Sequence, residues 1–192
     1  MRTTAIVVFL LGAALSATAQ IPGGNVYAGY SYTRADIFSP SLLVQPPSRT
    51  ANFNGWQASL EGKFLPFIGI VADVSQTYGS ADFSLCGPVV PCSPGQIRID
   101  SRLLTVMVGA RASVSVSRFT PFAEALFGGA HASESRAVSA SDTSFATAIG
   151  GGLDYKLIKG VAWRFQGDAL HTHLFGAGQN NLRLSTGLVL RF

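Results

Sequence analysis

The sequence predicts an all-β fold, an eight-stranded antiparallel up-and-down transmembrane β-barrel. Three observations lead to this prediction. Apolar and polar residues alternate with a period of two along several segments, the connections between those segments are alternately short and long, and charged residues gather on one of the two faces. Composition agrees, since 47% of the residues are hydrophobic, only 12% are charged and 21 are glycine. So low a charge content indicates that part of the surface faces something other than water.

Residues 1–19 have the three parts of a secretory signal peptide. Arg2 supplies a positive start, residues 5–15 form an apolar run, and residues 17–19 (Ala-Thr-Ala) offer the small side chains of a cleavage site. The apolar run is shorter than the roughly 18 residues that a spanning helix needs. We therefore expect a signal peptide over residues 1–19 and a barrel domain over residues 20–192, with a retained N-terminal anchor as the alternative.

The period-two alternation is clearest in two segments. Within residues 53–64, small or apolar residues occupy the even positions from Trp56 onward and polar residues the odd positions from Gln57 onward. Residues 182–192 repeat the pattern, and six further segments fit it less clearly: 25–33, 67–78, 99–114, 121–132, 144–155 and 161–170. Eight strands of roughly ten residues are what tilted crossings of a bilayer require.

The connections between these segments alternate in length. Those at residues 65–66, 115–118 and 156–160 are short. The connections over residues 35–52, 79–98 and 133–143 are long and rich in Ser, Pro and Asp. Short turns at one end and long loops at the other are the arrangement of membrane-spanning barrels.

Charge lies on one face of the predicted strands. The apolar-facing residues in the middle of the strands carry none: Ala28, Tyr30, Leu60, Ile70, Ala72, Val106, Val108, Ala125, Phe127, Ile149, Phe165 and Leu188. The opposite face holds five acids and five bases: Glu61, Asp73, Glu124, Asp154, Asp168, Lys63, Arg111, Arg164, Arg183 and Arg191. Because ions away from water must pair, we expect these ten side chains to fill the lumen as a charge network. An ion or proton path along them is the alternative, although eight strands leave an interior just wide enough for side chains.

Cys86 and Cys92 are the only cysteines of the sequence, and both lie in the second long connection. An exported chain passes through an oxidising compartment, so we expect a disulfide between them. A redox or metal-binding pair is the alternative.

Candidate catalytic groups gather only near the end of the seventh predicted strand. There Asp168 precedes His171 and His173, but the alternation turns the carboxylate inward and both imidazoles outward. A hydrolase needs its base beside both a nucleophile and an orienting carboxylate. We therefore expect no enzyme activity, cofactor or metal site. The 14 Lys and Arg, one of them Arg2, against 10 Asp and Glu are too few and too scattered to indicate nucleic acid binding.

Two segments carry a resemblance to a known family. Residues 111–132, in which Thr-Pro-Phe at 120–122 leads into Ala-Leu-Phe-Gly-Gly-Ala at 125–130, and the ending from Gln179 to Phe192 resemble the small outer-membrane β-barrel domain family, related to the OmpA and OmpX barrels. In that family, a terminal aromatic preceded by alternating apolar residues is read by the barrel assembly machinery. The resemblance therefore implies that Leu188, Leu190 and Phe192 form such an assembly signal.

Together these features predict a structural or surface protein of the bacterial outer membrane with a plugged lumen and long extracellular loops. Its expected partners are outer-membrane lipids and the barrel assembly machinery, and it is expected to be a monomer. The sequence does not identify an extracellular partner. A narrow channel and a lipid A-modifying enzyme are the alternatives.

Overall fold

The computed structural model describes residues 23–38, 44–45, 48–85, 96–135, 140–174 and 177–192. The strands assigned in these residues are β1 (Gly24–Phe38), β2 (Val44–Gln45), β3 (Ser48–Lys63), β4 (Ile68–Leu85), β5 (Gln96–Ser113), β6 (Phe119–Ser135), β7 (Ala140–Ile158), β8 (Val161–Leu174) and β9 (Ala177–Arg191). No helix long and apolar enough to cross a membrane occurs in this part of the chain.

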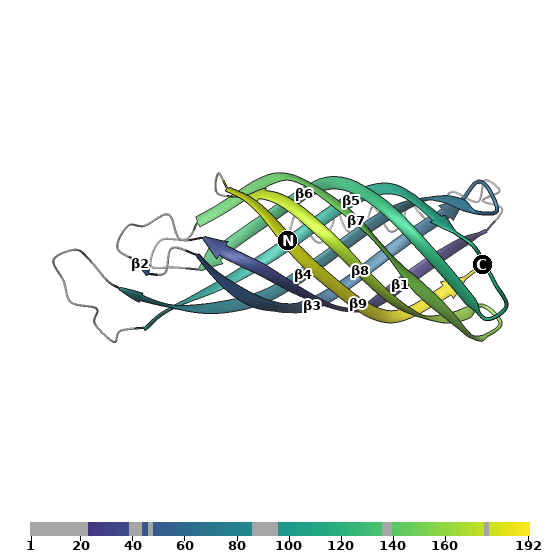
Figure 1. Ribbon diagram of the computed structural model, residues 1–192, viewed down its shortest axis with the longest axis horizontal. Coiled ribbons are helices and arrows are strands. Elements are labelled where there is room, and N and C mark those ends of the chain that lie inside the picture. The colour runs from purple at the N-terminus through teal and green to yellow at the C-terminus, as the bar shows by residue number, and fades with distance from the viewer. Residues whose placement is uncertain (1–22, 39–43, 46–47, 86–95, 136–139, 175–176) are drawn as a thin grey trace, which may run out of the picture.

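The strands close into one antiparallel barrel (Figure 1). Its wall runs β4-β3-β1-β9-β8-β7-β6-β5 and is completed by pairing of β5 with β4. The last strand pairs with the first, from Asn25↔Arg191 to Arg34↔Leu182. The two-residue β2 pairs with β4 and is not part of the wall. Closure leaves no strand edge without a hydrogen-bonding partner in lipid, and the predicted eight-stranded barrel is confirmed.

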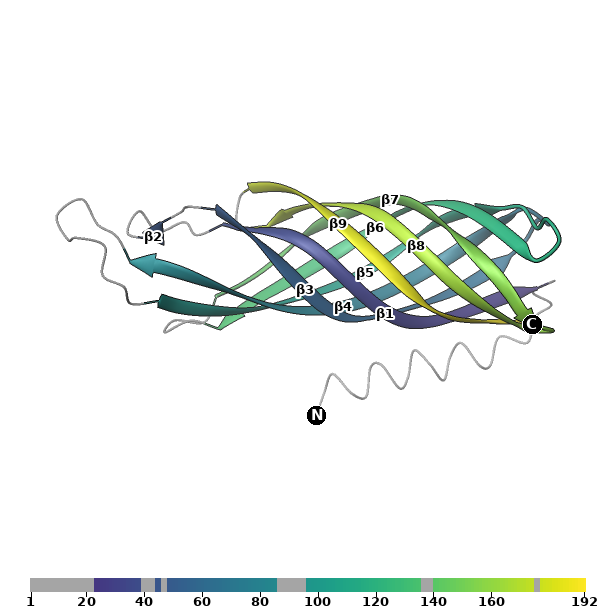
Figure 2. The same cartoon turned by 60° about the horizontal axis from the view of Figure 1, so that its bottom comes forward.

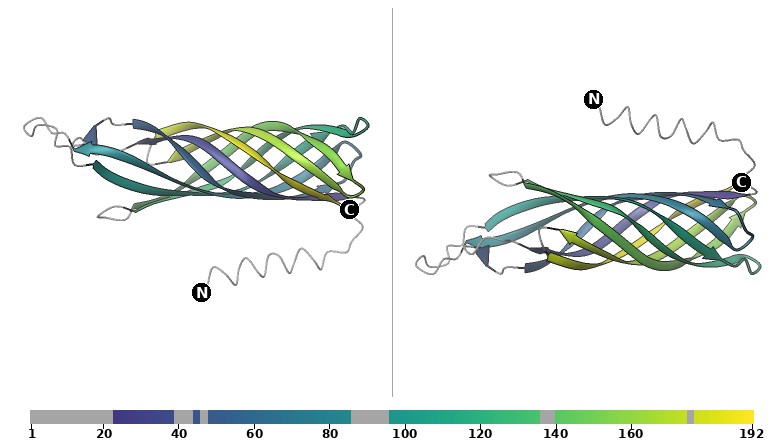
Figure 3. Two further views of the ribbon diagram at one scale, coloured as in Figure 1. Left: turned by 90° about the horizontal axis from the view of Figure 1, so that it is seen from below. Right: turned by 90° about the horizontal axis from the view of Figure 1, so that it is seen from above.

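The two ends of the barrel differ (Figure 3). At the end where the C-terminus lies, short connections over residues 64–67, 114–118 and 159–160 join the strands. Left-handed φ angles at Ser117 (56°) and Gly160 (82°) allow the chain to reverse within two of these connections. They match the predicted short turns closely.

At the opposite end, the hairpins are longer than the sequence suggested. Pairing of β1 with β3 continues to Phe38↔Ser48, and pairing of β4 with β5 continues to Ser84↔Gln96. The prediction of loops over residues 35–52, 79–98 and 133–143 is therefore wrong where strand pairing continues into them. Both faces of such an extension meet water, so it needs no apolar alternation to mark it as a strand.

The wall has an apolar outside and a largely polar inside. Every residue of the predicted uncharged set is exposed, up to 71% for Ile149, whereas Ser75, Thr105 and Gln166 are buried. A soluble barrel would show the reverse. The exposed apolar band thus suits lipid, as the alternation predicted.

Candidate functional site

Arg111 of β5 anchors the first part of the buried charge cluster inside the barrel. Its Nε donates to Glu124 Oε2 at 2.7 Å and its Nη1 to Glu61 Oε2 at 3.0 Å. Asn25 Nδ2 also donates to Glu61 Oε2, at 2.8 Å. Only 1% of Arg111 is exposed, so its charge is balanced by protein groups and not by bulk water.

Arg183 of β9 anchors the second part in the same way. Its Nε donates to Asp168 Oδ2 at 2.9 Å, and its Nη1 donates to Asp73 Oδ1 at 3.0 Å. Gln57 Nε2 donates to the other oxygen of Asp73 at 2.6 Å. The guanidinium therefore joins β4, β8 and β9 across the lumen.

Gln166 of β8 links these two parts. Its Nε2 donates to Glu124 Oε1 at 2.7 Å and to Asp168 Oδ2 at 3.0 Å. The result is one continuous chain of hydrogen bonds that draws on every wall strand except β7. We call it the lumen network, and its members are Asn25, Gln57, Glu61, Asp73, Arg111, Glu124, Gln166, Asp168 and Arg183.

A smaller cluster lies nearer the short-turn end. Arg164 donates two hydrogen bonds to Asp154, from Nε at 2.7 Å and from Nη2 at 2.9 Å. Arg191 Nη2 donates to the same carboxylate at 3.0 Å. The Phe122 ring lies 4.5 Å from Arg164 Cζ and 4.6 Å from Arg111 Cζ, and so it touches both clusters. Tyr27 lies under Arg164 at 5.1 Å. Contacts of this kind stabilise desolvated cations.

The structure thus brings nine of the ten predicted charges into ion pairs, but in two clusters and not one. Lys63 lies apart from both, since its Nζ donates to Ser113 Oγ at 2.9 Å. Sequence reasoning missed the amides of Asn25, Gln57 and Gln166 because it considered charged residues alone. The alternation had already placed Gln57 on the inward face, which was the available signal.

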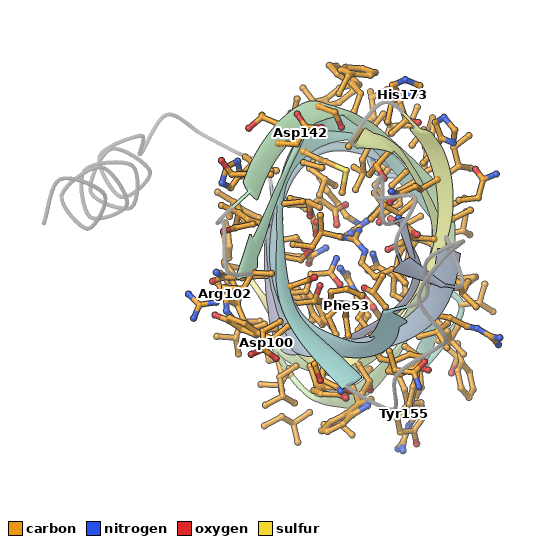
Figure 4. All side chains as sticks on the ribbon, turned by 90° about the vertical axis from the view of Figure 1, so that its left-hand side faces the viewer. Phe53, Asp100, Arg102, Asp142, Tyr155 and His173 are labelled. Carbon is orange, nitrogen blue, oxygen red and sulfur yellow. The ribbon has the colours of Figure 1, made fainter. Side chains whose placement is uncertain are left out.

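The lumen is also not ionic throughout. A buried apolar cluster, which we call the apolar half, consists of Val71, Leu103, Met107, Leu126, Ala130, Ala132, Ala146, Ala148 and Leu170. Met107 and Leu103 follow Arg111 toward the long-hairpin end of β5, and Leu126 follows Glu124 in the same direction on β6. Phe53 is 4% exposed and points into the ring in the view along the barrel (Figure 4). Val71, which pairs with Glu61, is the one member of the apolar half at the level of the charges. The expectation of an ionic interior therefore holds only for the part nearer the short turns.

The comparisons with known proteins agree with this geometry. A model of the outer membrane protein beta-barrel domain family matches residues 5–192. The chain belongs to this family. Membership indicates the bacterial outer membrane.

Solved structures of similar fold include neisserial surface protein A, NspA, and Ail, the attachment invasion locus protein of Yersinia pestis. NspA is 15% identical with a TM-score of 0.64, over 88% of this chain and 97% of its own. Ail is 17% identical with a TM-score of 0.55, over 88% and 98%. Identities this low show the shared fold alone. No curated protein matches the chain in sequence.

The histidines near the rim of this outer-membrane barrel do not form a catalytic site with Asp168. That carboxylate faces the lumen and pairs with Arg183, whereas His171 and His173 lie exposed on the outside. His171 Nδ1 is 2.7 Å from Asn180 Oδ1 on the neighbouring strand. Within the described ranges, no group of three or more His, Cys, Asp or Glu is placed to hold a metal ion.

The proposed assembly residues Leu188, Leu190 and Phe192 all lie exposed on the outer wall. Phe192 N donates to Gly24 O at 3.1 Å and Gly24 N to Phe192 O at 3.0 Å, so the closing seam extends to this residue. Cys86, Cys92 and residues 1–19 lie outside the described residues, and the disulfide and the signal peptide stay predictions.

Proposed function

We propose that this outer-membrane barrel is a structural surface protein with a plugged lumen, whose long hairpins are presented to the outside. The observation that carries the proposal is the lumen network. It crosses the interior without interruption from Asn25 to Arg183, and the apolar half, apart from Val71, lies over it on the hairpin side. A water-filled path would have to displace both layers.

The energetics support a permanent plug. Removing one partner of a buried ion pair typically costs about 3–5 kcal/mol because the other charge is left without compensation. Opening a path through the network would expose several such charges at once. An eight-stranded barrel also has no spare width beside its interior side chains.

The hairpins at the opposite end from the short turns support the surface role. Pairing of β3 with β4 ends at Tyr78, which pairs with Arg102 of β5. Pairing of β4 with β5 continues for six further residue pairs beyond this level. The names of Ail and NspA, an attachment protein and a surface protein, are in keeping with such a role. We propose export through the signal peptide, insertion by the barrel assembly machinery and a monomeric state in outer-membrane lipid.

Conductance in planar bilayers tests the plug. We expect the unmodified protein to give no steady current, and Glu61→Gln to give brief openings because Arg111 then loses a partner. Arg102→Gln is the matched control, since Arg102 lies exposed on the outer wall over Tyr78. Stable single-channel currents from the unmodified protein would contradict the proposal and favour the narrow-channel alternative.

The lipid A-modifying alternative has its own test. Overexpression should leave the mass spectrum of lipid A unchanged, because Asp168 is turned away from His171 and His173. A new lipid A species that disappears in the His171→Ala variant would establish the enzyme instead.

A further inference from the structure

The outward wall is hollowed where β7, β8, β9 and β1 adjoin. A groove of about 650 Å³ lies there, and its floor is formed by residues 151–153, 165–167 and 184–186. Tyr30 and Tyr32 of β1 complete its lining. Figure 2 shows these four strands side by side on one flank of the barrel. The groove thus belongs to the lipid-facing surface and is distinct from the lumen.

Two glycines explain the hollow. Gly151 and Gly167 pair directly across β7 and β8, and Gly167 lies between the inward-facing Gln166 and Asp168. Directly paired residues share a face, so two neighbouring outward positions carry no side chain. The exposed side chains of Phe165 and Leu184 stand beside this gap.

The end of the groove toward the long hairpins is polar. The Tyr30 hydroxyl donates to Asn54 Oδ1, and the Tyr32 hydroxyl donates to Asn52 Oδ1 at 2.8 Å. Arg34 is the next outward residue of β1 beyond Tyr32 and lies exposed. It pairs with Leu182, two residues beyond the groove residue Leu184. The β1 side of the apolar groove therefore carries two tyrosine hydroxyls, held by amides of β3, and a cation lies beyond them.

We propose that this groove binds one lipid of the outer leaflet with an anionic phosphate headgroup, its acyl chain lying over Gly151 and Gly167 and its phosphate beside Arg34. Within a bilayer the hydrophobic effect does not favour one apolar surface over another, so selectivity comes from close packing and headgroup pairing. The glycine floor supplies the packing. Arg34 supplies the charge complementarity, since guanidinium pairs well with phosphate.

Trp163 provides a reporter for the groove. Its Nε1 donates to Thr186 Oγ1 at 2.8 Å, and its ring centroid lies 6.4 Å from that of Phe165. Thr186 and Phe165 both line the groove. The full-length chain with Trp56→Phe is refolded into phosphatidylcholine vesicles containing increasing fractions of dibrominated phosphatidic acid or dibrominated phosphatidylcholine. Bromine quenches the fluorescence of Trp163 on contact. We expect half-maximal quenching at about a threefold lower mole fraction of phosphatidic acid, the effect of one exposed ion pair.

Two variants and two matched controls locate the effect. Gly167→Leu fills the groove, and a Cβ at this position meets only Leu184 Cδ2, at 3.3 Å. The control Gly129→Leu adds the same side chain on β6, where a Cβ meets only Ser144 O, at 3.9 Å. Arg34→Gln removes the cation, with Arg102→Gln as its control. Gly167→Leu should abolish the preference and Arg34→Gln should reduce it, while both controls keep it.

Several outcomes overturn the proposal. These are equal quenching by the two lipids in the parent protein, a preference that survives both Gly167→Leu and Arg34→Gln, and an equal loss in Gly129→Leu. A cross-linked dimer that Gly167→Leu abolishes would assign the groove to a second copy of this chain. Heat-dependent gel mobility identifies any variant that fails to fold. If Gly167→Leu fails to fold, the comparison of Arg34→Gln with Arg102→Gln tests the proposal, because both arginines are exposed.

Discussion

Phe122 shows how single residues hold the charged interior together. Its ring lies against the guanidinium groups of Arg111 and Arg164, which belong to different clusters. An aromatic face attracts desolvated cations while filling volume that would otherwise admit water. Apolar and ionic contacts inside the barrel therefore share the same side chains.

Arg183 is the residue whose loss should be most costly. Arg183→Gln leaves Asp73 and Asp168 without their cation in a fully buried site. We expect the free energy of unfolding to fall by about 3–5 kcal/mol, measured from urea titrations in detergent. Arg102→Gln, on the exposed wall, should change it by less than about 0.5 kcal/mol. Equal, small effects of the two changes would show that the network does not stabilise the barrel.

At this scale the sequence predicted which charges lie inside but not how they pair. Alternation alone places Glu61 and Arg111 on the inward face, since each lies in a strand with a regular period of two. It does not reveal that Gln166 bridges two carboxylates, because that depends on registers between strands far apart in the chain. Lys63 is inward by the same alternation, yet it hydrogen bonds to Ser113 near the rim.

At the scale of the elements, glycines on β7 allow adjacent strands to approach closely. A Cβ on Gly150 would lie 2.1 Å from Asp168 Oδ1 and 2.4 Å from Gly167 O. Contact this close leaves no room for a side chain unless β8 shifts. The close pairing of β7 with β8 therefore depends on the absence of a side chain at Gly150.

Gly150→Ala tests this dependence. We expect it to lower the free energy of unfolding by about 1–3 kcal/mol through overpacking. Gly129→Ala is the control, because its Cβ would meet only Ser144 O at 3.9 Å. Urea unfolding of both variants gives the comparison, and a Gly150→Ala barrel as stable as the control would refute the close approach.

The strands were located more reliably inside the bilayer than outside it. The segment predicted at residues 182–192 corresponds to β9, which begins five residues earlier at Ala177. Residues 79–85 and 96–98 were assigned to a loop but lie in β4 and β5. Lipid imposes alternation on the wall, whereas water on both faces of a hairpin imposes none.

At the scale of the whole molecule, closure depends on the seam between β9 and β1. The last strand pairs with the first, as closure of the predicted barrel requires, and the pairing extends to two backbone hydrogen bonds between Phe192 and Gly24. The Phe192 ring is 66% exposed, yet it lies over Gly24, where an added Cβ would approach it to 2.5 Å. The residue thus serves the seam as well as the membrane interface.

Deletion of Phe192 separates a role in assembly from a role in stability. Loss of the ring should cost the finished barrel no more than about 1.5 to 3 kcal/mol because most of the ring is exposed, and loss of the two backbone hydrogen bonds to Gly24 should add about 0.5–1.5 kcal/mol each. If Leu188, Leu190 and Phe192 form the signal that the family resemblance implies, insertion in cells should fall far more than refolding in detergent. Phe64→Ala is the matched control, since it removes an exposed ring from the same end of the barrel without touching the seam. The measurement compares surface-exposed protein in cells with refolding yield for both variants. An equal fall in the two assays, or no fall in either, would show that Phe192 is not read during assembly.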